Sequence, residues 1–234
     1  MRAWCLAAAL VAALFLGSRQ ASAQADVALV LAVDVSGSVS DARFKLQREG
    51  IAGAIDSDAF AQAVLGGVNR TVEIAVVEWA EEQEIVVPWT VVHDRDGLAK
   101  LALRLRGAGR AWVHTKTDVG GGIAAAADLL AKAPLVAERK VIDVSGDGQQ
   151  NTGEIPAAEA RDAAVAREIT VNGLPITSGD EPHVDDWYRA NVVGGPRSFL
   201  IVADGYDAFA EAFRQKLTLE VASAQSRMLL AYVP

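Results

Sequence analysis

A carboxylate and two hydroxyls occur at alternate positions of one short segment, at Asp34, Ser36 and Ser38. In extended backbone, residues i, i+2 and i+4 point to the same side, so these oxygens can converge while Gly37 lets the loop curl. Hard oxygen ligands of this kind suit Mg²⁺, Mn²⁺ or Ca²⁺. The segment therefore has two interpretations: part of a cation site, or a Ser/Gly turn in which Asp34 caps the following helix.

Further oxygens follow or precede other predicted elements. Asp147 comes soon after the predicted strand 140–145, and Thr117 and Asp118 come just before the glycine-rich stretch 120–122. A small octahedral cation needs more than three ligands, so these oxygens bear on the first interpretation. In an open α/β sheet, ligands bind beyond the carboxyl ends of the strands, where the chain order reverses. The sequence thus predicts one oxygen-lined cation site at that edge, with Mg²⁺ favoured and Mn²⁺ or Ca²⁺ as alternatives.

Hydrophobic patterning predicts the elements that must position these residues. The apolar run 27–33 is typical of a strand buried on both faces of a parallel sheet. The runs 71–79 and 84–92 are joined by a short charged link, which favours a hairpin, and Pro88 places the second run at the sheet edge. The predicted fold class is α/β: a doubly wound, mostly parallel central sheet with one antiparallel edge strand and helices on both faces. The other predicted strands are 140–145, 169–176 and 198–202, the predicted helices are 40–55, 56–65, 94–106, 119–133, 155–168 and 207–222, and the acidic stretch 180–186 is expected to be a loop.

The first 23 residues have the pattern of a signal peptide. Arg2 precedes the apolar stretch 3–16, and residues 21–23 are the small side chains of a cleavage site. That apolar stretch is too short to span a membrane, and the only cysteine of the chain, Cys5, lies within it. We therefore expect a chain exported to the periplasm or exterior of a bacterium, with residues 24–234 forming a single domain.

The charge of the expected mature chain argues against two classes of partner. Without Arg2 and Arg19, the 22 basic residues fall to 20 against 30 acidic ones, a net charge near −10. Nucleic acid and anionic membrane surfaces are therefore not expected as partners. The mature chain also has only three scattered histidines and no cysteine, which argues against a zinc or copper site. No second apolar stretch is long enough to cross a bilayer.

The order of these motifs resembles the von Willebrand factor type A domain with its metal-ion-dependent adhesion site. That site is written Asp-x-Ser-x-Ser after the first strand, a Thr in a later loop, and Asp-Gly after the fourth strand. Residues 34–38 match the first element, Thr117 ahead of 120–122 is similar to the second, and Asp147-Gly148 is similar to the third. The resemblance covers about residues 26–222.

A closer resemblance is to an uncharacterised group of exported bacterial proteins within that superfamily. In this chain, a Gly-Gly-Thr-Ser loop usual in the group is replaced by residues 114–118, so that Thr115 is an alternative to Thr117 as the loop ligand. The group supplies no activity. The stretches that carry the resemblance are LAVDVSGS (31–38), LQREG (46–50), 77–79 with 87–90, VIDVSGDGQQN (141–151) and 172–176.

The resemblance implies a non-enzymatic binding module. Asp34 and Asp147 would balance a divalent ion, while the hydroxyls of Ser36, Ser38 and Thr117 add no charge and leave the ion electrophilic. An acidic side chain of a partner protein would then complete the coordination, making recognition metal-dependent and reversible.

Two other functions stay open from the residues. A metal-assisted hydrolase is one, with His114 as its single candidate base, although no phosphate loop, nucleophile elbow or zinc-protease motif accompanies it. A structural scaffold with a non-functional site is the other. Asp143, inside a predicted strand, either supports the site loops by hydrogen bonds to them or, as we favour, is a structural acid held by backbone donors.

Overall fold

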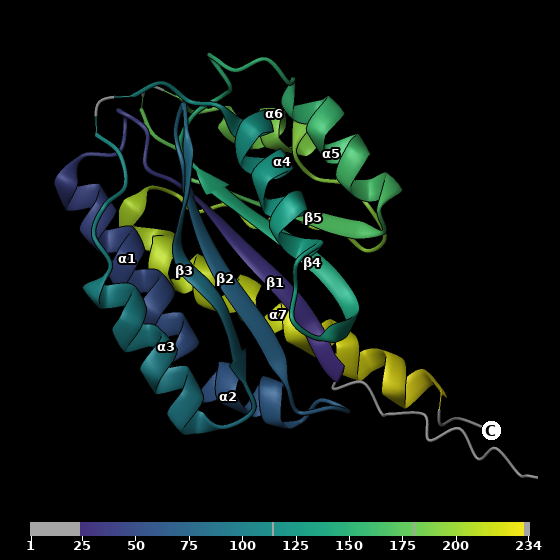
Figure 1. Ribbon diagram of the computed structural model, residues 1–234. Helices are drawn as coiled ribbons and strands as arrows, with labels where there is room; N and C mark the ends of the chain where they lie inside the picture. The colour runs from purple at the N-terminus through teal and green to yellow at the C-terminus, as the bar shows by residue number, and fades with distance from the viewer. Residues whose placement is uncertain (1–23, 114, 180, 232–234) are drawn as a thin grey trace, which may run out of the picture.

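A computed structural model of the chain describes residues 24–113, 115–179 and 181–231 (Figure 1). The predicted signal peptide 1–23 and His114 lie outside the described residues. Within them, five strands form one sheet in which all neighbours are parallel except β3 and β2. The predicted fold class is thereby confirmed. The strand order is β3 (Gln83–Val92), β2 (Val72–Trp79), β1 (Gln24–Asp34), β4 (Val136–Gly146) and β5 (Ile169–Pro175).

The central strand, β1, is apolar because it is covered on both faces. All of its residues after Gln24 are buried, as expected for a parallel strand between two layers of helices. Its register pairs Val33 with Ser145 of β4 and Asp34 with Trp79 of β2. The carboxyl ends of three strands therefore meet at one edge of the sheet, and the loops that follow β1 and β4 start side by side.

Helices cover both faces of the sheet (Figure 1). Each layer encloses its own hydrophobic core, one including Phe60, Phe209 and Phe213 and the other including Trp79 and Ile123. No helix in the described residues is both long and apolar enough to cross a membrane. The first layer contains α1 (Asp41–Ile55), α2 (Asp58–Leu65), α3 (Arg95–Gly107) and α7 (Tyr206–Ala231), and the second contains α4 (Val119–Leu130), α5 (Ala157–Ala166) and α6 (Val184–Asn191).

Side-chain caps fix the helix starts nearest the site. The Ser40 hydroxyl accepts from the backbone N–H of Arg43 at the start of α1, and Asp118 accepts from Gly121 at the start of α4. Asp34 is thus not the cap of the following helix, so the capping part of the turn interpretation is wrong, although residues 36–39 do form a turn. Its Oδ1 instead accepts from the backbone N–H of Ser36, within the loop itself.

Edge strand β3 carries Pro88, as predicted, and the register with β2 shifts between Ile74 and Val76.

Two predictions near the other edge of the sheet are wrong. Residues 198–202 touch β5 only at isolated bridges, since Pro175 has no N–H for a ladder and the Asn172 side chain takes the Phe199 N–H. Part of the expected loop 180–186 is the start of helix α6, which is short and buries only Val184 and Tyr188.

Candidate metal centre

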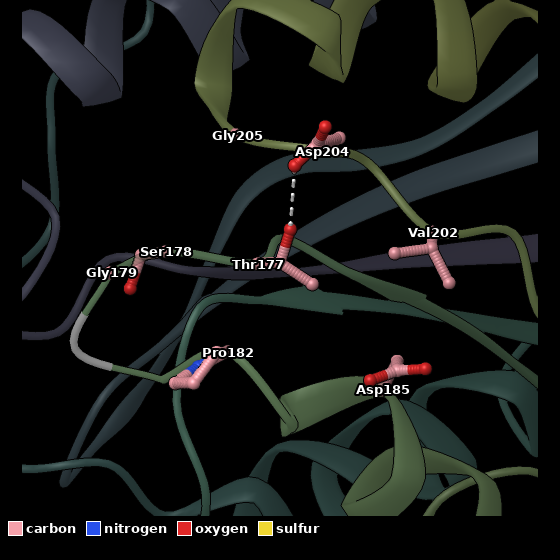
Figure 2. Close-up of a pocket in the computed structure, with 8 residues that line it drawn as sticks. All are labelled: Thr177, Ser178, Gly179, Pro182, Asp185, Val202, Asp204 and Gly205. Carbon is pink, nitrogen blue, oxygen red and sulfur yellow. Dashed lines mark hydrogen bonds between the residues drawn. The ribbon is translucent and has the colours of Figure 1, made fainter.

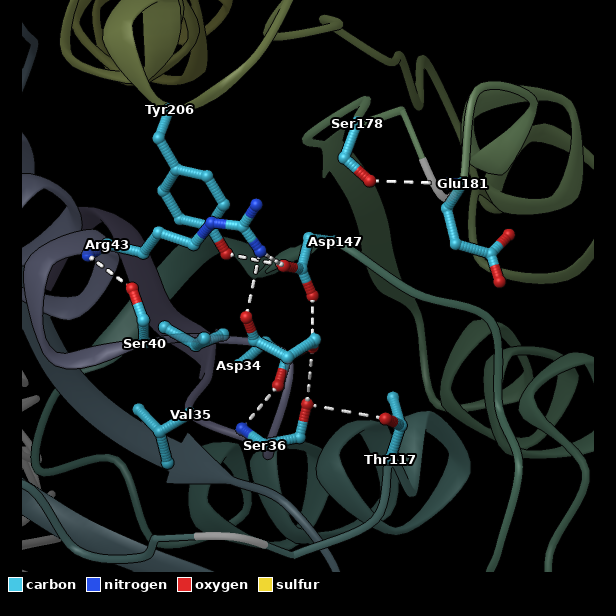
Figure 3. Close-up of polar contacts among 12 residues, drawn as sticks. Asp34, Val35, Ser36, Ser40, Arg43, Thr117, Asp147, Ser178, Glu181 and Tyr206 are labelled. Atoms are coloured by element: carbon cyan, nitrogen blue, oxygen red, sulfur yellow. Dashed lines mark hydrogen bonds and ion pairs between the residues drawn. The ribbon is translucent and has the colours of Figure 1, made fainter.

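The loops after β1 and β4 bring the predicted oxygens into one cluster (Figure 3). The Ser38 hydroxyl donates to Asp147 Oδ1 at 2.5 Å, and its oxygen is 3.3 Å from that of Ser36. The Thr117 hydroxyl, just before α4, donates to Ser36 Oγ at 3.3 Å. Asp34 ends β1 beside them and is fully buried. The structure thus gathers all five predicted ligands from three separate segments.

Asp34 is held in a setting that suits a cation. One of its oxygens accepts from Ser36, whereas Oδ2 is buried and has no hydrogen-bond partner among the described residues. Burial, and secondly the negative charge of Asp147, raise the pKa of Asp34 to about 7. Two buried carboxylates beside three hydroxyls fit a hard divalent ion, which would relieve both effects.

The predicted ligands of the candidate metal centre are all oxygen atoms. Among the described residues, no group of three or more His, Cys, Asp or Glu side chains gathers in metal-binding geometry. The candidate centre has only two carboxylates, Asp34 and Asp147, and its other oxygens are neutral hydroxyls. Such a set suits oxygen-seeking ions and lacks the nitrogen and sulfur ligands typical of zinc or copper sites.

Thr117 and Thr115 occupy different positions in the loop before α4. The backbone N–H of Thr117 donates to Asn151 Oδ1 at 2.9 Å, and the Asn151 N–H donates back to the Thr117 carbonyl. This exchange fixes Thr117 next to the loop after β4. Thr115 instead accepts from the Gly37 N–H through its carbonyl, and its buried hydroxyl has no partner among the described residues. Of the two threonine hydroxyls, only that of Thr117 is hydrogen-bonded to another predicted ligand.

Two residues that sequence reasoning missed hold Asp147 from the helices. The buried Tyr206 hydroxyl, at the start of α7, donates to Asp147 Oδ2 at 2.8 Å. Burial and the charges of Asp147 and Asp34 raise the pKa of Tyr206, so the phenol stays protonated and donates. Arg43 of α1 places Nη1 3.4 Å from the same oxygen. Neither residue has a local sequence signal, because each reaches the site through helix packing.

A second tyrosine, Tyr188, has its hydroxyl near the Asp34 carboxylate. A Cβ atom at Gly146 would lie 2.5 Å from the Tyr188 hydroxyl oxygen and 2.8 Å from Asp34 Oδ2. Both oxygens therefore border the small space beside the Gly146 Cα, and neither has a hydrogen-bond partner among the described residues. Glycine is required at this position because the two oxygens occupy the room a side chain would need.

Arg110 braces the backbone of the first loop. Its Nη2 donates to the carbonyls of Val39 at 2.6 Å, Val35 at 3.0 Å and Ser36 at 3.3 Å. The next residue is fixed as well, since the Ala111 N–H donates to Glu78 Oε2 at 2.7 Å. The segment after α3 thus holds the Asp-x-Ser-x-Ser loop in its curled form.

Asp143 belongs to a separate buried cluster. It pairs with the Lys216 ammonium from α7, and both side chains are fully buried. Asp143 is therefore a structural acid, as favoured from the sequence, but its recorded partner is an ammonium rather than the backbone donors we expected. Lys216 Nζ also lies 3.6 Å from Glu220 Oε1, which ties the cluster along the helix.

A hollow of about 690 Å³ lies beyond the end of β5 (Figure 2). Asp185 and Asp204 are on its wall, and the Thr177 hydroxyl donates to Asp204 Oδ1 at 3.3 Å. None of the five predicted ligands lines this hollow. It is therefore distinct from the candidate metal centre.

The model of the family described as Protein of unknown function (DUF1194) matches residues 24–225. No curated protein gives a significant match to the sequence.

Comparison with solved structures shows that this chain has the von Willebrand factor type A fold. A von Willebrand factor type A protein from Catenulispora acidiphila has 20% identity and a TM-score of 0.57, covering 83% of this chain and 42% of its own. Proximal thread matrix protein 1 from the mussel byssus, with a zinc-occupied MIDAS motif, has 16% identity, TM-score 0.56 and coverages of 86% and 48%. The vWF domain of the type V pili tip protein Mfa5 from Porphyromonas gingivalis has 13% identity, TM-score 0.57 and coverages of 84% and 96%. The chain thus spans less than half the length of the first two.

Proposed function

We propose that this chain, which belongs to the family described as Protein of unknown function (DUF1194), is an exported, non-enzymatic module that binds a partner protein through a divalent cation. The observation that carries the proposal is the cluster itself. Asp34, whose buried Oδ2 has no hydrogen-bond partner among the described residues, lies at the same end of the sheet as the linked hydroxyls and Asp147. A buried, unpaired charge is costly, and a bound cation would remove that cost.

Five side chains would hold the ion: Asp34, Ser36, Ser38, Thr117 and Asp147. When bound, a divalent ion supplies an electrophilic position for one more oxygen ligand. The two carboxylates balance the charge of the ion. The three hydroxyls are neutral and leave the ion electrophilic. The donor set favours Mg²⁺, with Mn²⁺ or Ca²⁺ as alternatives. An acidic side chain of the partner is the ligand that fits the remaining position.

The similar structures support a role outside the cytoplasm. One is a pilus tip domain, and another is a byssus matrix protein with an occupied MIDAS motif. A place in a pilus tip or in the byssus agrees with the signal peptide predicted for residues 1–23. We therefore propose a periplasmic or secreted location and a protein partner, with no nucleic acid involved.

A peptide array tests this function directly. Purified protein is applied, with Mg²⁺ or with chelator, to peptides containing Asp or Glu and to matched peptides with Asn or Gln. The proposal expects binding to acidic peptides that disappears on chelation, on amide substitution and in the Asp147→Asn variant. Asp128→Asn, on the exposed surface of α4, serves as the matched control. Binding that survives chelation would contradict the proposal.

A further inference from the structure

Arg43 lies on the solvent-exposed side of Asp147 in the candidate metal centre. It lies in the first turn of α1, and its Nη1 donates to the Ser38 carbonyl at 2.9 Å and approaches Asp147 Oδ2 at 3.4 Å. The guanidinium carbon is 5.0 Å from the centre of the Tyr206 ring, which supports the group from one side. The Arg43 side chain is 38% exposed, whereas that of Asp147 is 2% exposed. Arg43 thus extends from the buried Asp147 toward solvent. Figure 3 shows its guanidinium beside Asp147.

The remaining donors of Arg43 are open. Both hydrogen bonds of the Arg43 side chain use Nη1, and within the described part of the chain Nε and Nη2 have no hydrogen-bond partner. These two nitrogens form the side edge of the guanidinium, with two parallel N–H groups at the spacing of a carboxylate. An arginine held at one end and free along this edge is set to receive a planar anion.

We propose that Arg43 is a second anchor for the partner's carboxylate, which it binds through Nε and Nη2 while the cation binds the same group. This inference rests on the proposed function. It gives the site a preference for carboxylate over neutral oxygen ligands, since a divalent ion cancels the charges of Asp34 and Asp147 and Arg43 adds one more positive charge. The same charge must also repel the ion, so Arg43 favours the partner's anion at the expense of metal affinity.

The two opposed effects distinguish this role from structural support. Replacing Arg43 by alanine removes both charge and fork, so Mn²⁺ should bind about two- to fivefold more tightly and acetate about tenfold more weakly. Arg43→Lys keeps the charge and loses the fork. We therefore expect its Mn²⁺ affinity to match that of the wild type while acetate binding is weakened.

The experiment uses the metal and acetate as probes. Free Mn²⁺ is measured by its electron paramagnetic resonance signal, and acetate by the loss of water-proton relaxation enhancement as it displaces water from bound Mn²⁺. Sodium chloride of equal ionic strength serves as the salt control. Arg106→Ala is the matched variant, since Arg106 is similarly exposed at 34% and pairs with Glu49 away from the site. It should change neither affinity.

The outcomes separate the two proposals. The anchor role is supported if Arg43→Ala binds Mn²⁺ more tightly and acetate more weakly than the wild type. Arg43→Lys should bind acetate more weakly with its Mn²⁺ affinity unchanged. A fall in both affinities in Arg43→Ala would make Arg43 a structural support, and unchanged acetate binding in either variant would also overturn the inference while leaving the metal site intact. Absence of Mn²⁺ binding in the wild type would contradict the proposed function itself, and this inference with it.

Discussion

The hydroxyl of Ser38 lies 2.5 Å from Oδ1 of Asp147, although the two residues are 109 positions apart in the chain. The pairing of β1 with β4 produces this contact, because Val33 and Ser145 are in register and the loops that follow leave the sheet together. The candidate metal centre is therefore a product of strand order, and each of its ligands can be tested separately.

Removal of the Ser38 hydroxyl should weaken metal binding without unfolding the protein. We expect Ser38→Ala to lower Mn²⁺ affinity about tenfold, measured by titration calorimetry. Ser40→Ala is the control, because Ser40 caps α1. It should lower the free energy of unfolding by about 1 kcal/mol and leave Mn²⁺ affinity unchanged. Equal affinities for all three proteins would remove Ser38 from the ligand set.

Thr117 and Thr115 should differ as loop ligands. Thr117→Val replaces a hydroxyl bonded to Ser36 and should reduce Mn²⁺ affinity about tenfold. Thr115→Val changes a hydroxyl without a recorded partner and should leave the affinity as it is. Calorimetry on the two variants decides the assignment, and the reverse ranking would make Thr115 the ligand.

The metal-free protein should lose stability as the pH rises toward neutrality. With a pKa near 7, Asp34 holds a proton in the folded state that the unfolded chain releases near its usual value of 3.8. The stabilisation is fully present below about pH 4 and is lost as the pH rises through 7. Urea unfolding under chelation should show a fall on the order of 2 kcal/mol between pH 5 and 7.

Asp34→Asn should abolish this fall, since its amide does not titrate in that range, whereas Asp56→Asn, on the exposed end of α1, should retain it. Parallel stability profiles for wild type and Asp34→Asn would show that Asp34 titrates normally.

The parallel strands and the ends that carry Asp34 and Asp147 could be predicted from the sequence because a continuous apolar run and the chain rules of α/β sheets fix them. Arg43 and Tyr206 could not. Their approach to Asp147 depends on how α1 and α7 are rotated against the sheet, which side-chain packing decides. The prediction of a strand at 198–202 was wrong for a related reason. The apolar pattern of this segment suits a strand, but Pro175 interrupts the ladder with β5.

Gly146 should tolerate no side chain. A Cβ there would meet the Tyr188 hydroxyl and Asp34 Oδ2, so Gly146→Ala should lower the free energy of unfolding by about 1 to 3 kcal/mol. Gly148→Ala is the matched control two residues on, where no atom beyond the adjacent residues lies within 4 Å of the added carbon. Chemical denaturation compares the two. Equal stability of both variants would show that Tyr188 and Asp34 do not border Gly146 as described.

The buried cluster around Lys216 should contribute to stability but not to metal binding. Lys216→Met would leave Asp143 and Glu220 buried without the ammonium, and we expect a loss of about 3 to 5 kcal/mol. Arg214→Ala, on the exposed side of the same helix, should have no measurable effect. A Lys216→Met protein as stable as the wild type would contradict the pairing of Lys216 with Asp143.

The most direct test of the metal centre is the thermal unfolding midpoint of chelated protein during titration with Mg²⁺, Mn²⁺ or Ca²⁺. A ligand that binds only the folded state must raise the midpoint. We predict a rise that saturates with metal in the wild type and in Asp128→Asn, and that is absent in Asp34→Asn. A midpoint unchanged by every ion in the wild type, or an equal rise in Asp34→Asn, would contradict a cation site at Asp34.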